Sequence, residues 1–126
     1  MGTEAMACYQ KAIELQPGFM LAQMHLAWLL ATCPESSVRN GDKAVLLAEQ
    51  ANQISKDKDP QVLRTLAAAY AEAGRFPDAV LTAKQALALA VAKTDAELTS
   101  ELQVEIGLYQ TNSPCRSKPL YRSKDN

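Results

Sequence analysis

The stretch YAEAGRFPDAV, residues 70–80, places a glycine and a proline in the middle of an alanine-rich run. The residues just before it have high helix propensity, and Gly74 suits the left-handed residue that ends a helix. Pro77 is favoured in the first turn of a new helix, and Asp78 adds negative charge near the positive end of that helix dipole. Because only two or three residues separate the helices, they must fold back antiparallel. The stretch predicts a helical hairpin.

The hairpin belongs to an internal repeat. Residues 4–18 (EAMACYQKAIELQPG), 42–56 (DKAVLLAEQANQISK) and 77–91 (PDAVLTAKQALALAV) align with one another at intervals of about 35 to 39 residues. Two further helical segments, 19–33 and 60–73, lie between them. Small residues let helices approach closely and bulky residues fill the gaps, which predicts stacked helices. The small positions are Ala44, Ala48, Ala51, Ala79, Ala83 and Ala86, and the bulky ones are Leu26, Leu30, Leu66 and Tyr70.

The pattern resembles the tetratricopeptide repeat family, whose unit is two antiparallel helices in about 34 residues. The resemblance covers residues 4–91. It is carried by Leu63, Leu66, Ala67, Tyr70, Gly74, Phe76, Ala79 and Ala86, and by Ala5, Tyr9, Ala12 and Pro17.

This chain also departs from the family pattern. Leu63 stands where the family often has tryptophan, Ala67 replaces a glycine, and Gln23 replaces an aromatic residue. The turn CPESSVRNGD is about five residues longer than usual, as in a variant seen in bacterial tetratricopeptide proteins. The resemblance implies an all-α solenoid of about two and a half repeats, whose first helices line a concave groove that binds protein partners.

We expect helices near residues 4–15, 20–33, 41–55, 60–73, 77–91 and 95–110, in one domain over residues 1–110. The last helix should cap the stack, beginning with a capping box of Thr94 and Glu97. Its apolar stripe, which should pack on the last repeat, is Leu98, Leu102, Ile106 and Tyr109.

Residues 111–126 lack periodicity and predict a flexible basic tail. We expect this tail to act as a local pseudo-ligand, in which Leu120 and Tyr121 offer apolar side chains. Its basic residues, Arg116, Lys118, Arg122 and Lys124, would meet the acidic residues of the last helix, Asp95, Glu97, Glu101 and Glu105.

Composition argues against several function classes. The chain has 126 residues, 48% of them hydrophobic, which suffices for one modest core. A net charge of −1 gives no argument for binding nucleic acid, and no apolar run approaches the ~20 residues of a membrane span. Cys8, Cys33 and Cys115 lack metal-ligand spacing and predict free thiols, which slightly favour the cytoplasm but leave the compartment open. His25 is expected to be a boundary residue. We therefore expect a protein that is no enzyme and needs no cofactor or metal.

Two faces of the expected helices predict a partner groove. The segment 20–33 is apolar nearly all round, and its second face would need a partner unless a neighbouring helix or the tail covers Trp28. In the segment 60–73, which would be the first helix of the following repeat, small alanines leave room for a peptide with an apolar side chain. Arg64 in this segment would hold a carboxylate or carbonyl of the peptide. The predicted groove residues are Leu21, Met24, Trp28, Thr32, Gln61, Arg64, Ala68 and Glu72.

The ends of the stack predict self-association as the alternative function. Residues 4–16 match the second helix of a repeat whose first helix is missing, so we expect either a piece of a longer array or an adhesive edge that forms a homodimer. The predicted edge residues are Tyr9 and Ile13 at one end and Val104 and Leu108 at the other. We further expect Tyr70 and Phe76 to be buried, and alanine at Trp28 to cost less stability than alanine at Tyr70.

Overall fold

The computed structural model describes residues 2–116, and within them the chain is all α, with no strand. The expected helix bounds are confirmed to within about two residues. The helices are α1 (Gly2–Leu15), α2 (Met20–Thr32), α3 (Gly41–Ser55), α4 (Pro60–Glu72), α5 (Phe76–Ala92) and α6 (Ala96–Gln110). None of these helices is long and apolar enough to cross a membrane.

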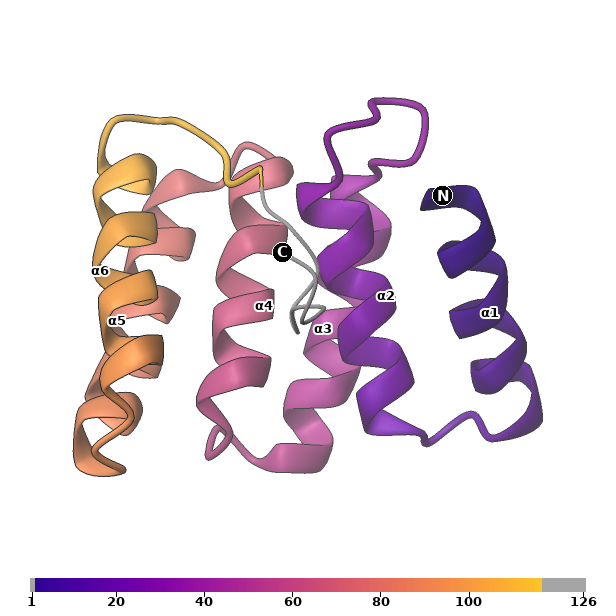
Figure 1. The fold of residues 1–126 in the computed structure, drawn as a ribbon, viewed down its shortest axis with the longest axis horizontal. Helices are drawn as coiled ribbons and strands as arrows, with labels where there is room; N and C mark the ends of the chain where they lie inside the picture. The colour runs from indigo at the N-terminus through magenta and orange to yellow at the C-terminus, as the bar shows by residue number, and fades with distance from the viewer. Residues whose placement is uncertain (1, 117–126) are drawn as a thin grey trace.

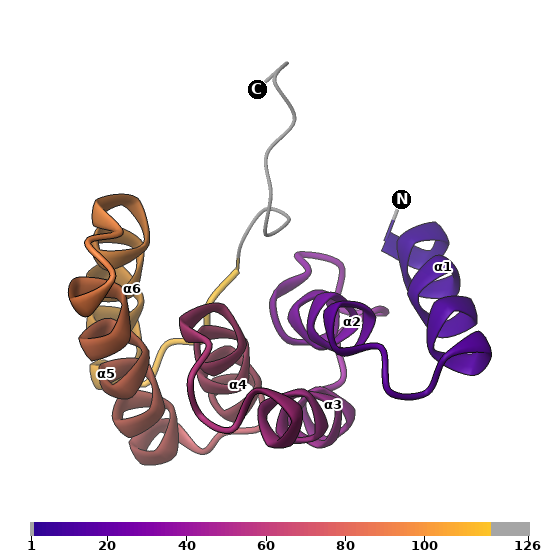
Figure 2. The same cartoon turned by 90° about the horizontal axis from the view of Figure 1, so that it is seen from below.

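The helices stack as antiparallel hairpins, side by side (Figure 1). Each helix packs on the next one along the chain, and α2 also packs on α4, its counterpart in the following hairpin. Viewed along the helix axes, α2 and α4 are neighbours, and α3 lies below them in the view and packs on both (Figure 2). This arrangement is helical-repeat-like, because equivalent helices of successive hairpins are neighbours.

The turn between α4 and α5 has the predicted chemistry. Gly74 is left-handed, with a φ of 83°, and the amide of Arg75 donates to the carbonyl of Tyr70 at 2.8 Å. Helix α5 begins at Phe76, so Pro77 lies in its first turn as expected. A glycine that ends one helix and a proline that starts the next thus produce the tight reversal.

The cap of α6 differs from the prediction. The carboxylate of Asp95 accepts a hydrogen bond from the backbone amide of Leu98 at 3.1 Å, so Asp95 is the N-cap. Thr94 is left-handed, with a φ of 55°, and its hydroxyl donates to the carbonyl of Lys93. The prediction of a capping box formed by Thr94 and Glu97 is therefore wrong, because the helix begins one residue later than that box requires.

Close helix packing rests on the predicted alanines. All six small positions are completely buried, which confirms that the helices approach closely there. Leu26, Leu30 and Leu66 are buried as well, whereas Tyr70 and Phe76 are only partly buried. The burial expected for these two aromatic residues is wrong, since both pack on the core from its margin.

Helix α6 closes the stack in the expected way. Its apolar stripe, from Leu98 to Tyr109, is buried against the preceding helices. The chain then runs back across the helix ends towards α4, as the yellow segment of Figure 1 shows. Within this segment Cys115 is buried in the core, and Arg116 lies 2.8 Å from Glu72.

The predicted flexible tail therefore needs a correction at its start, because Ser113 and Pro114 are partly buried and Cys115 is buried. Arg116 pairs with Glu72 of α4 and not with the acidic last helix. The remaining tail residues of the pseudo-ligand prediction, Lys118, Leu120, Tyr121, Arg122 and Lys124, lie outside the described part of the chain.

The long turn between α2 and α3 folds onto the same end of the stack. Val38 is buried in the core, and Arg39 donates to the carbonyls of Cys33 and Pro34 at 2.8 and 3.1 Å. The side chain of Asn40 accepts from the amide of Lys43 and so caps α3. The extra residues thus form an ordered cover over the end of the hairpin.

Candidate functional site

The predicted groove wall is buried within the chain. Trp28 is 3% exposed and Arg64 4%, while Gln61 and Glu72 are partly buried and Leu21 is exposed. Of the eight predicted groove residues, five are buried: Met24, Trp28, Thr32, Arg64 and Ala68. The expectation that these five form an open wall must be corrected, because other parts of the same chain cover them. Their participation in partner binding stays a prediction.

Arg64 binds a carboxylate, but the carboxylate belongs to α6. Its Nε lies 3.0 and 3.1 Å from the two carboxylate oxygens of Glu105, and its Nη2 lies 2.6 Å from one of them. Glu101 adds a second carboxylate at 3.7 Å. On the other side, the Arg64 guanidinium lies 4.5 Å from the ring centre of Trp28. Arg64 therefore connects α2, α4 and α6 through polar and cation–π contacts.

Burial of the Arg64–Glu105 pair shifts the pKa values of both groups. Burial raises the pKa of the Glu105 carboxyl, while the hydrogen bonds and charge of Arg64 oppose that shift. Burial lowers the pKa of Arg64, but Glu105 and Glu101 outweigh this effect, so its pKa is raised and it stays protonated. Each charge therefore depends on the other for compensation.

A buried hydroxyl and a buried thiol lie beside the ion pair. The buried Tyr109 hydroxyl lies beside the Cys115 thiol, and burial raises the pKa of this phenol. Burial raises the pKa of the Cys115 thiol to about 12, and the Glu105 charge adds to this effect. A thiol that stays protonated is a poor nucleophile.

Glu72, another predicted groove residue, also has internal partners. One carboxylate oxygen lies 2.8 Å from Arg116, and the other lies 3.4 Å from Arg39. These contacts join the end of α4 to the long α2–α3 turn and to the segment after α6. Glu72 therefore stabilises the end of the stack and does not face solvent as a free carboxylate.

The predicted self-association edge is mostly turned inward. Tyr9, Ile13 and Leu108 are partly buried against the core, and the Tyr9 ring stacks on His25 with centroids 5.6 Å apart. Only Val104, at 67%, is largely exposed. The exposed positions of α1 are mainly polar or small: Thr3, Glu4, Ala7, Cys8, Lys11, Glu14 and Leu15. The bare apolar face expected on this helix is therefore not formed.

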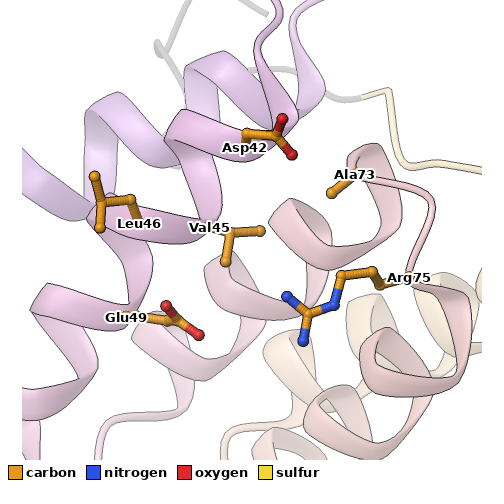
Figure 3. A pocket seen from close by; sticks show the side chains of 6 residues that line it. All are labelled: Asp42, Val45, Leu46, Glu49, Ala73 and Arg75. Atoms are coloured by element: carbon orange, nitrogen blue, oxygen red, sulfur yellow. The ribbon is translucent and has the colours of Figure 1, made fainter.

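An open hollow lies on the surface between α3 and the α4–α5 turn (Figure 3). It has a volume of about 320 Å³. Val45 points into it between Asp42 and Glu49, and Arg75 reaches in from the turn. Its lining residues are Asp42, Val45, Leu46, Glu49, Ala73 and Arg75.

Close backbone contact sets one end of this hollow. A Cβ on Gly41 would lie 2.8 Å from the backbone nitrogen of Ala73, so only glycine lets the start of α3 come this near to the end of α4. The Tyr70 hydroxyl donates to Glu49 at 3.2 Å, which joins the two helices further along. The hollow is therefore bounded by fixed contacts at both ends.

The sequence did not single out the lining of this hollow. Asp42 and Glu49 are seven residues apart in the chain, which places them on one helix face. This spacing alone could have predicted an acidic face on the helix. Their distance from Arg75 depends on how two hairpins pack, which no local pattern reveals. Glu105 was missed as the partner of Arg64 for the same reason.

The described residues contain no group of three or more side chains that could hold a metal ion. In class, the chain is thus an all-α stack of helical hairpins with an internally paired centre and an open surface hollow. Comparison with protein-family models, curated proteins and solved structures finds no match.

Proposed function

We propose that this chain is a protein-interaction module that binds a segment of a partner protein. The observation that carries the proposal is the hollow between α3 and the α4–α5 turn, where Leu46 is 57% exposed beside charged groups. Stacked helical hairpins offer extended surfaces that suit such partners. The resemblance of residues 4–91 to tetratricopeptide repeats supports the same class of function.

The concave groove is the second location for a partner in this proposal. Binding there requires that Trp28 and Arg64 become accessible, and both are buried. Exposing Arg64 would break its contacts with Glu105 and leave two charges without compensation, which is costly. We therefore place the proposed contact at the hollow.

Self-association without a peptide ligand is the alternative function. Its support is that Leu15 on α1 and Val104 on α6 are large apolar residues exposed at 77% and 67%. Each is a single apolar residue among mostly polar exposed neighbours, and such residues are common on protein surfaces. This observation favours the alternative less than the hollow favours partner binding.

Selection from a random library of displayed peptides tests the proposed function. We expect enriched peptides that bind the purified chain and shift the amide NMR signals of α3 and the α4–α5 turn. Shifts confined to α2 and α4 would place the partner in the concave groove instead. No enrichment, together with a dimer in light scattering at micromolar concentration, would reject the proposal in favour of self-association.

A further inference from the structure

The hollow carries an excess of negative charge. Asp42 and Glu49 are carboxylates on its α3 side, and the one guanidinium of the lining, Arg75, already pairs with Asp78 at 3.0 Å. The Arg75 guanidinium also lies 4.4 Å from the ring centre of Tyr70. The lining thus has two carboxylates and one guanidinium, so a cationic group that enters from solvent meets a net negative charge.

The surface between the two carboxylates is apolar. Val45 is 8% exposed and forms the floor, and Leu46 lies beside it with more than half of its surface in contact with solvent. Lysine and arginine combine an aliphatic stem with a charged head, so they can cover such a floor while their heads reach a carboxylate. The lining therefore matches basic side chains better than purely apolar or acidic ones.

The spacing of the carboxylates adds a second constraint. Seven residues of an α-helix span about 10 Å along its axis, so Asp42 and Glu49 are too far apart for one cation to contact both. A polyproline-type segment rises about 9 Å in three residues and returns to the same side after them. Two basic side chains three residues apart in such a segment match the two carboxylates.

We infer that the hollow receives an extended segment of a partner protein that carries two basic side chains three residues apart. The basic heads meet Asp42 and Glu49, and the aliphatic stems of the same side chains cover Val45 and Leu46. This inference rests on the proposed function, because it specifies which kind of segment the module binds.

The test is an NMR titration of the full chain with the peptide acetyl-Ala-Lys-Pro-Leu-Lys-Ala-amide. A peptide with glutamine in place of both lysines and one with an extra alanine between them serve as controls. The variant Asp42→Asn with Glu49→Gln removes the two carboxylates. The variant Glu14→Gln with Glu35→Gln removes two exposed carboxylates elsewhere and has the same net charge.

We expect the lysine peptide to shift the amide signals of α3 and of residues 73–75, and its dissociation constant to rise at least tenfold in the Asp42→Asn, Glu49→Gln variant. In the Glu14→Gln, Glu35→Gln variant, the dissociation constant of the lysine peptide should change less than twofold. Both control peptides should bind the unmodified chain more weakly than the lysine peptide does. Equal weakening in both variants would overturn the inference, because it would mean attraction to the overall charge. Absence of binding by the lysine peptide would also overturn it. The proposed function would still stand if library-selected peptides of other chemistry bind.

Discussion

Arg64 and Glu105, 41 positions apart in the chain, form an ion pair that is almost completely removed from solvent, with side chains 5% and 8% exposed. Breaking a buried pair by removing one partner leaves an uncompensated charge, at a cost of about 3–5 kcal/mol. We therefore expect Arg64→Met to lower the free energy of unfolding by about 3 kcal/mol or more, measured by urea unfolding and circular dichroism.

The surface pair of Arg75 and Asp78 provides the matched control. Its side chains are 51% and 49% exposed, and exposed ion pairs contribute about 1 kcal/mol or less. Arg75→Met should therefore cost much less than Arg64→Met. Equal losses in the two variants would show that the Arg64 pair is solvated in solution.

The burial of Trp28 and Tyr70 is the reverse of what the sequence suggested. Trp28 is nearly fully buried under Arg64, whereas Tyr70 is partly buried at the surface. Truncating a buried aromatic residue costs about 3–5 kcal/mol. We expect Trp28→Ala to reach this range and Tyr70→Ala to cost less, in the same unfolding measurement. A smaller loss for Trp28→Ala would indicate that its ring is exposed in solution.

Two glycines should respond to alanine in opposite directions. A Cβ on Gly41 would lie 2.8 to 3.0 Å from backbone atoms of Glu72 and Ala73, which cannot move aside as a flexible side chain can. We expect Gly41→Ala to cost about 1–3 kcal/mol. Gly107 lies in α6 with nothing within 4 Å of its Cβ position, so Gly107→Ala should add about 0.5–1 kcal/mol. Thermal unfolding of both variants checks the contrast, and a stabilising Gly41→Ala would contradict the close contact.

His25, the only histidine of the chain, should make the stability of the fold depend on pH. Burial lowers the pKa of His25 below its ordinary value of 6.5. Between the folded and unfolded pKa values the unfolded chain binds more protons, so stability rises with pH in this window. We expect the free energy of unfolding to fall as the pH drops from 7 through 6.5 and below. His25→Gln should remove this slope, and an unchanged slope in that variant would assign it to another group.

The three thiols should differ in their rates of alkylation. Cys8 is exposed, whereas Cys33 and Cys115 are buried, and burial raises the pKa of Cys115 to about 12. Because the thiolate is the reactive form, Cys115 should react only after local opening. Mass spectrometry after a short iodoacetamide pulse at pH 8 should find Cys8 modified and the other two largely intact. Rapid labelling of Cys115 would show that the segment after α6 is released in solution.

Local sequence patterns were sufficient to predict the helices and most of their turns. Gly74, Pro77 and the completely buried alanines act through backbone preference and size, which are properties of the residues themselves. The N-cap of α6 was misplaced because Thr94 and Asp95 are adjacent residues that can both cap a helix, and only the backbone path decides between them.

The candidate site was less predictable, because it depends on contacts between distant residues. An apolar face on α2 shows that Trp28 must be covered, but the sequence does not say whether this chain or a partner covers it. The same holds for Arg64, whose need for a carboxylate is visible in the sequence while its choice of Glu105 is not. Pairing across 41 positions follows from the stacking geometry.

The contacts of Arg64 with Trp28 of α2 and Glu105 of α6 also affect how the stack comes apart. Repeat proteins in which each unit touches only its neighbours fray from their ends, and the units open one after another. Here a single side chain at the centre joins the first complete hairpin to the last helix, so loosening one of them removes a contact from the other. Amide hydrogens in α2 and α6 should therefore exchange with the same opening free energy, and the protein should melt cooperatively as a single unit.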